Sequence, residues 1–243
     1  MLNAHYKGKI NISDYWAVGD RRTISLSAIP TGNASESQPA QSIDFVIIGI
    51  KHDDLTSAIN GTTKAAITVQ SIVALNTTGG MDQSAYEPAS AIWENCSRRA
   101  WCNDDFISYG LPSDLAKLLK SVTKLSNRYC SNSYSDYSSY RTHGTTDDKV
   151  FILSEVEVEG AQYCNDSQSG SLRDDGSQYE YMKLAQNRVK TVSGNSKSWW
   201  TRTGHVNSSG RTYFHNIDMY GDLEGTSLVS NYSSCGICPA FCL

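Results

Sequence analysis

Two continuous apolar runs and one amphipathic stretch define the most regular part of the chain. Residues 42–55 open with SIDFVIIGI, and residues 64–75 read KAAITVQSIVAL. Runs of β-branched and aromatic residues of this length are typical of buried strands. After Pro112, the stretch SDLAKLLKSVTKLS carries leucines and valine at spacings of three and four, with Ser113 or Asp114 placed as an N-cap. This spacing predicts a short amphipathic helix that packs on one face.

The segments that follow are a polar stretch and then an alternating one. SNSYSDYSSYRTHGTTDD has little to bury, so we expect a loop, whereas KVFILSEVEVEG alternates apolar and acidic residues at its end and predicts a strand. Glu155, Glu157 and Glu159 would then share one face, either as a cation site or, as we favour, as a solvated strand surface. Together these elements predict an α+β domain with short strands, one or two helices and a large irregular fraction.

Composition and charge narrow the classes of function. The 243 residues are 39% hydrophobic, which suffices for a sizeable core, and no internal repeat or clear domain boundary is visible. The net charge of −4 gives no reason to expect nucleic acid, which requires a basic face. The first residues carry no apolar core of a secretory signal, and no run of about 18 apolar residues occurs. We therefore expect neither a signal peptide nor membrane insertion.

The cysteine pattern does not predict a metal or redox centre. A zinc site would need a second ligand pair besides the CGIC of Cys235 and Cys238, and a redox CxxC normally begins a helix after a strand. We expect neither metal nor cofactor, and we interpret most cysteines as small buried apolar residues. The chain has seven: Cys96, Cys102, Cys130, Cys164, Cys235, Cys238 and Cys242.

Motifs of the common catalytic centres are also missing. The chain contains no GxSxG, HExxH, P-loop or GxGxxG sequence. No catalytic centre can be assembled from the sequence, so we do not expect an enzyme.

The C-terminal segment has the composition of a binding surface. From Thr201 to Tyr232 it mixes Tyr, Ser, Asn, His and Asp, much as antibody paratopes do. A plain solvated loop would have a similar composition, but apolar anchors flank the segment and favour a displayed surface. We predict that Trp93, Trp101, Trp199, Trp200 and Phe241 are buried. We predict one exposed ligand-binding face made of His205, Asn207, Ser208, Arg211, Tyr213, His215, Asn216, Asp218, Tyr220, Asp222 and Tyr232.

Several segments resemble a known domain family along nearly the whole chain from Trp16. They are WAVGDRRTISL, DFVIIGIKHDDLT, IWENCSRRAWCNDDF, TTDDKVFILSEVEVEG, WWTRT and GICPAFCL. In this order they resemble DUF6273, a domain common in gut Firmicutes and their phages. The resemblance implies the C-type-lectin-like, formylglycine-generating-enzyme-like fold. Proteins with this fold include variable proteins of diversity-generating retroelements and phage tail receptor-binding proteins. Their hypervariable residues lie between a tryptophan motif and the closing strand.

The chain departs from the catalytic and calcium-binding members of that fold. Formylglycine-generating enzymes use a cysteine pair, whereas here no cysteine lies between Cys164 and Cys235. Calcium-dependent lectins use EPN or QPD with WND, whereas Glu87 and Pro88 are followed by Ala89 and no WND occurs. Catalysis of the first kind and sugar binding through calcium are therefore not expected.

The resemblance implies a ligand-display domain over residues 16–243, with residues 1–15 as an N-terminal extension and a variable segment at about 201–234. The expected function is that of a phage tail receptor-binding protein or a retroelement-diversified adhesin, and the expected partner is a host-surface protein or glycan. A homotrimer or attachment to a phage tail, on a virion or a bacterial cell surface, would fit this role. The alternatives are a structural or assembly protein of a phage particle and, third, an enzyme of the formylglycine-generating type.

Overall fold

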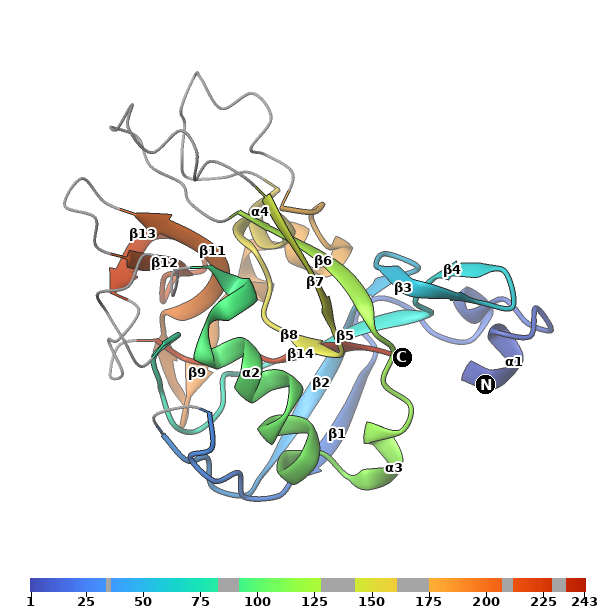
Figure 1. Ribbon diagram of the computed structural model, residues 1–243, viewed down its shortest axis with the longest axis horizontal. Helices are drawn as coiled ribbons and strands as arrows, with labels where there is room; N and C mark the ends of the chain where they lie inside the picture. The colour runs from blue at the N-terminus through green and yellow to red at the C-terminus, as the bar shows by residue number, and fades with distance from the viewer. Residues whose placement is uncertain (34–35, 83–91, 128–142, 161–174, 207–211, 229–234) are drawn as a thin grey trace.

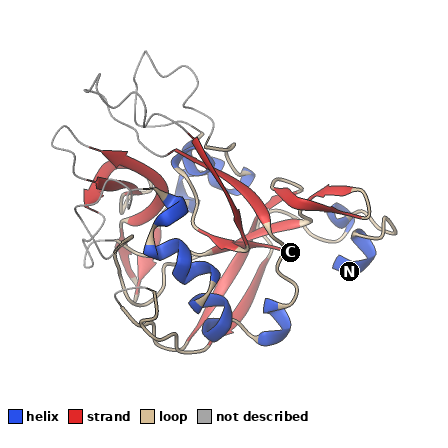
Figure 2. Ribbon diagram, viewed as in Figure 1, coloured by secondary structure: helices blue, strands red, loops and turns tan. Residues whose placement is uncertain are grey.

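The computed structural model describes residues 1–33, 36–82, 92–127, 143–160, 175–206, 212–228 and 235–243. Over these residues short strands predominate and the helices are brief, so the fold is mixed α+β, as the sequence predicts (Figures 1 and 2). The three-stranded C-terminal sheet lies at the opposite end of the molecule from the N-terminal helix α1 (Figure 1).

A five-stranded antiparallel sheet forms the centre of the fold. Its strands, in spatial order, are β1 (Arg21–Leu26), β2 (Gln41–Ile50), β5 (Ile67–Ser71), β14 (Ala240–Cys242) and β8 (Val150–Phe151). The two strands expected from continuous apolar runs are confirmed as β2 and β5, and every residue of β5 is buried. The C-terminal strand β14 lies between β5 and β8, where Phe241 pairs with Val69 on one side and Val150 on the other.

Three smaller sheets surround this centre. The four-stranded sheet contains β4 (Thr62–Lys64), β3 (Asp54–Ile59), β6 (Val122–Asn127) and β7 (His143–Asp148). The three-stranded sheet contains β11 (Trp199–Val206), β12 (Thr212–Ile217) and β13 (Leu223–Leu228). The two-stranded sheet contains β9 (Lys190–Val192) and β10 (Asn195–Lys197).

In the part of the chain that the structure describes, the helical elements are all short. The α-helices are α1 (Leu2–His5), α2 (Ser97–Asn103), α3 (Ser113–Ala116) and α4 (Glu155–Glu159). The remaining helical turns are η1 (Ile12–Asp14), η3 (Trp93–Asn95), η4 (Phe106–Gly110), η6 (Glu180–Lys183) and η7 (Ala185–Asn187).

The helix expected after Pro112 is much shorter than predicted. Only Ser113–Ala116 is helical, and Val122–Asn127 forms strand β6. Val122 pairs with Asp148 of β7. The β-branched end of this segment therefore forms a strand beside β7 instead of continuing the helix.

The strand predicted over KVFILSEVEVEG is confirmed only at Val150–Phe151, which form β8, whereas the alternating part SEVEVE is a helix. Ser154 Oγ accepts a hydrogen bond from Glu157 N at 3.2 Å, while Ser154 N donates to Glu157 Oε2 at 3.1 Å. This reciprocal capping box starts α4, and Gly160, with φ of +74°, ends it. Because the segment is helical, Glu155 and Glu157 point into the protein and are buried instead of lining a solvated strand.

The expected anchors form part of one contiguous core. Trp93, Trp101, Trp199, Trp200 and Phe241 are all 0% exposed, which confirms that prediction. Tyr6 joins the N-terminal segment to the same core, because its hydroxyl donates to Leu243 O at 2.9 Å and accepts from Ala66 N at 2.9 Å.

The described cysteines behave as small buried side chains. Cys96, Cys102, Cys235, Cys238 and Cys242 are free thiols within the core, as predicted. Cys130 and Cys164 lie outside the described residues. Among the helices that the structure describes, none has the length and apolar character needed to cross a membrane.

Candidate functional site

The structure places the predicted binding residues in several different settings. Tyr220 and Asp222 are exposed, Tyr220 by 72%, and Tyr213 and Asp218 are half-buried. Outside the described residues lie Asn207, Ser208, Arg211, Tyr232 and the side chain of His205.

The prediction that His215 and Asn216 are exposed is wrong. Both belong to β12, the middle strand of the three-stranded sheet, and they are 0% and 3% exposed. Consecutive strand residues point to opposite faces, so both faces of the sheet are covered here. His215 Nδ1 pairs with the carboxylate of Glu155 in α4, while Asn216 Nδ2 donates to Cys235 Sγ at 3.5 Å. These two side chains hold the sheet in place and cannot reach a ligand on the surface.

The exposed residues sit on a tight turn between β12 and β13. Asp218 Oδ1 accepts hydrogen bonds from the backbone N of Tyr220 at 2.8 Å and of Asp222 at 2.9 Å. Asp218 N also donates to Asp222 O at 2.8 Å, and Gly221 N donates to Asp218 O at 3.2 Å. Four hydrogen bonds therefore fix five residues, and the turn displays Tyr220 from a preorganised backbone.

The turn also packs against the protein behind it. Gly221 has a φ of +92°, and a Cβ at this position would lie 3.0 Å from Ala185 O in η7. A side chain here would strain the backbone and crowd η7, so glycine is required for the turn to close. Met219 and Tyr220 remain the large exposed side chains of the turn.

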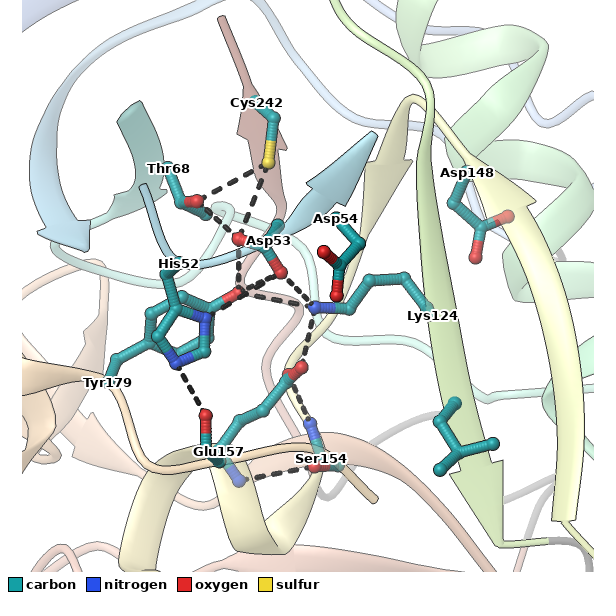
Figure 3. Close-up of polar contacts among 12 residues, drawn as sticks. His52, Asp53, Asp54, Thr68, Lys124, Asp148, Ser154, Glu157, Tyr179 and Cys242 are labelled. Atoms are coloured by element: carbon teal, nitrogen blue, oxygen red, sulfur yellow. Dashed lines mark hydrogen bonds and ion pairs between the residues drawn. The ribbon is translucent and has the colours of Figure 1, made fainter. Parts of the chain in front are cut away.

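A buried cluster of charges supports the sheet that carries this turn. The Arg202 guanidinium of β11 forms a bidentate pair with the Glu157 carboxylate of α4, with Nη2 2.9 Å from Oε1. Lys124 Nζ of β6 lies 2.5 Å from Glu157 Oε1 and 2.6 Å from Asp53 Oδ1 (Figure 3). None of these four charged residues is more than 5% exposed.

Neutral donors complete the cluster around Asp53. The Tyr179 hydroxyl donates to this carboxylate at 2.9 Å, and the Thr68 hydroxyl bonds to its second oxygen (Figure 3). Cys242 Sγ of the last strand donates to the same oxygen at 3.5 Å. The cluster thus connects β14, β5, β6, α4 and β11 through two carboxylates, those of Asp53 and Glu157, which Lys124 bridges.

The electrostatics keep the cluster charged. Burial alone would raise the pKa of Asp53, but the Lys124 ammonium holds it well below its usual range. Burial likewise opposes ionisation of Glu157, yet Arg202 and Lys124 lower its pKa. The pKa of Lys124 is raised, because the two carboxylates outweigh the effect of burial. Two negative and two positive charges therefore cancel inside the core, and their mutual hydrogen bonds compensate for lost hydration.

Among the described residues, the cluster connects secondary-structure elements and leaves no charged group open to a ligand. Its charged groups are enclosed and paired, so a substrate would have to displace an ion pair to reach them. Within the described residues, no group of three or more His, Cys, Asp or Glu side chains is placed to hold a metal ion. The arrangement instead locks β11, and with it the turn at Asp218, to the central sheet.

Reasoning from the sequence missed this cluster for an identifiable reason. Asp53, Lys124, Glu157 and Arg202 come from four distant segments, and each looks like an ordinary surface charge in its local context. The sequence does contain one relevant signal, the S-x-x-E pattern at Ser154. This pattern predicts the start of a helix, and in that helix Glu157 points inward.

Comparisons with known proteins gave a family but no closer relative. No curated protein and no protein of known structure gave a significant match to the chain. One family model, described as "Domain of unknown function (DUF6273)", matches residues 63–243, a span that includes β11–β13, the turn and every member of the charged cluster except Asp53. The chain therefore belongs to the DUF6273 family.

Proposed function

We propose that this protein is a ligand-binding module that presents its C-terminal turn to a receptor. The observation that carries the proposal is Tyr220, an aromatic side chain 72% exposed on a turn whose backbone is fixed by Asp218. Rigidly held tyrosine contributes contact area at a low cost in entropy, and such side chains dominate binding energy at interfaces. An exposed tyrosine without a ligand would have little reason to be held so firmly.

The scaffold behind the turn supports this role. Trp199 and Trp200 are fully buried at the start of β11, and Arg202 of the same strand is locked to α4. A binding surface is most effective when its supporting residues are fixed by packing and hydrogen bonds. The same three-stranded sheet therefore contains both the buried anchors, Trp199 and Trp200, and the exposed turn at Asp218.

The family resemblance supports a specific biological setting for this module. In the C-type-lectin-like proteins that this chain resembles, variable residues lie between a tryptophan motif and the closing strand. Here β11–β13 and the Asp218 turn occupy that interval, between Trp200 and β14. We assign the module to the receptor-binding end of a phage tail or to a diversified adhesin, with a host-surface protein or glycan as ligand.

Binding measurements with matched tyrosine variants test the proposal. The labelled protein is applied to Gram-positive bacterial cells, untreated, protease-treated or periodate-treated, and the wild type is compared with Tyr220→Ala. Tyr109→Ala is the control, because Tyr109 is also exposed but lies on η4, outside the C-terminal segment. We expect Tyr220→Ala to cost about 1–3 kcal/mol of binding free energy and the control to have no effect.

The two cell treatments identify the ligand class. Loss of binding after protease indicates a protein receptor, and loss after periodate indicates a glycan. Equal binding by the wild type and Tyr220→Ala would contradict the proposal.

A further inference from the structure

Three polar side chains at the edge of the charged cluster form a line from the surface into the core. Ser177 Oγ is 3.0 Å from His52 Nε2, and His52 Nδ1 is 3.8 Å from Asp53 Oδ1. Ser177 is exposed, the His52 side chain is 19% exposed, and Asp53 is buried. A hydroxyl, an imidazole and a buried carboxylate in this order match the roles of nucleophile, base and orienting acid.

The imidazole is held by ring stacking, and the backbone directly before it has an uncommon conformation. Its ring stacks on Tyr179 with centroids 4.0 Å apart and an interplanar angle of 29° (Figure 3). Lys51, directly before it, has a φ of +51°, a left-handed conformation that is uncommon for a residue other than glycine. Strained backbone of this kind clusters at functional sites, where the surrounding structure maintains it.

The carboxylate behind the imidazole is equally fixed. Tyr179 and Lys124 both bond to Asp53, so the carboxylate cannot rotate away from His52. The 3.8 Å separation from Nδ1 is longer than a hydrogen bond, as is common for catalytic pairs before a substrate binds.

The backbone around Ser177 supplies suitable donors. Gly176 has a φ of +110°, which turns the chain sharply just before the hydroxyl. Within the described part of the chain, the backbone N–H groups of Ser177 and Gln178 donate to no protein acceptor, whereas the next one, of Tyr179, donates to Glu157 O. Two adjacent free N–H groups at a nucleophile are the kind of donor that stabilises an oxyanion.

We propose that Ser177, His52 and Asp53 form a nucleophilic centre that cleaves small carboxylic esters. Ser177 Oγ attacks the ester carbonyl carbon and its proton passes to His52 Nε2. The ester C–O bond then breaks, and His52 returns the proton to the leaving alcohol. Water attacks the acyl-serine, gives a proton to His52 and releases the carboxylic acid as Ser177 regains its hydroxyl proton. No other reactant is required.

The centre has no sequence signature, which explains why motif analysis does not find it. Its residues occur in the order His52, Asp53, Ser177, and the serine lies in DGSQ rather than GxSxG. Triads are recognised by geometry and not by chain order. The proposal is also independent of ligand binding by Tyr220, because Ser177 precedes η6 whereas Tyr220 lies in the turn between β12 and β13.

Covalent labelling with a fluorophosphonate probe tests the centre directly. We expect mass spectrometry of the intact protein and of its peptides to find one adduct, on Ser177. The informative variant is His52→Gln, which keeps a side chain able to hydrogen-bond Ser177 but cannot act as a general base. We expect its labelling rate, and its rate of p-nitrophenyl acetate hydrolysis, to fall at least about 100-fold.

Two serine variants complete the experiment. Ser177→Ala should abolish both labelling and hydrolysis, whereas Ser57→Ala, at an exposed serine of β3, should leave both unchanged. Circular dichroism and a melting curve establish that each variant is folded. No adduct on Ser177 of the folded wild type, or equal labelling rates for the wild type and His52→Gln, would overturn the proposal.

Discussion

Arg202 and Glu157 form a bidentate ion pair in the core, and this pair joins strand β11 to helix α4. The remaining Arg202 donors are also used, because its guanidinium reaches the backbone oxygens of Leu125 and Ile152 at 3.0 Å each. A fully bonded arginine fixes the first strand of the C-terminal sheet in position and in register. The display of Tyr220 therefore depends on charges that no ligand can contact.

Removing one partner of this pair should destabilise the whole protein. We expect Arg202→Met to lower the free energy of unfolding by about 3–5 kcal/mol, because Glu157 would stay buried beside a single cation. Urea denaturation followed by circular dichroism measures the loss. Arg22→Met, at an exposed position of β1, is the control and should change stability by less than about 0.5 kcal/mol. A small effect of Arg202→Met would mean that the cluster relaxes easily.

Lys190 should make stability rise with pH. This lysine is buried near Cys238 and Arg21, and burial lowers its pKa to about 8. In the unfolded chain the pKa is about 10.4, so above pH 8 the folded state loses its proton first and the unfolded state binds more protons. The contribution of Lys190 to stability should then increase by about 1 kcal/mol between pH 7 and pH 9.

Lys190→Met provides the comparison for this pH effect. Urea denaturation of both proteins at pH 7, 8 and 9 gives the difference in their unfolding free energies, in which the other titrating groups largely cancel. The stability of the wild type should rise relative to that of Lys190→Met over this range. A constant difference would show that Lys190 stays charged in the folded protein.

The hydrogen bonds of Asp218 should stabilise the turn locally and not the whole fold. Asp218→Ala removes the acceptor for the N–H groups of Tyr220 and Asp222. We expect the turn to lose about 1–2 kcal/mol of local stability as a result. Hydrogen exchange should accelerate at these two amides and stay unchanged in β5. Asp218→Asn retains an acceptor oxygen and should have a smaller effect. Accelerated exchange throughout β5 would argue against a local role.

Truncating the exposed tyrosine should leave the fold intact. Tyr220→Ala is expected to change the unfolding free energy by less than about 0.5 kcal/mol, since the side chain is mostly in solvent. Thermal melting compares it with the wild type. A large loss of stability would show that Tyr220 is a packing residue and would remove the basis of the binding proposal.

The sequence predicts the core better than the surface. Continuous apolar runs identify β2 and β5, and the five aromatic anchors are buried as expected, because large apolar side chains have few alternatives to the interior. The paratope-like composition of their segment predicts exposed positions for His215 and Asn216, but both side chains are buried. Their burial depends on α4 and on Cys235, which come from other parts of the chain.

The local sequence pattern is also ambiguous where one segment carries signals for both a strand and a helix. SEVEVE has the period of a strand and the capping residues of a helix, and the hydrogen bonds of Ser154 decide in favour of the helix. Ser177 and His52 are far apart in sequence, and only the folded chain brings them within 3.0 Å.

The position of β14 has a consequence for the time course of folding. Strands β5 and β8 each leave an edge unpaired until residues 240–242 arrive between them. During synthesis these residues are made after every other strand of the sheet, so the central sheet cannot close until then. Pairings between distant segments form slowly, and open edges can associate with other chains in the meantime. The nascent protein should therefore be most prone to aggregation just before this strand is inserted.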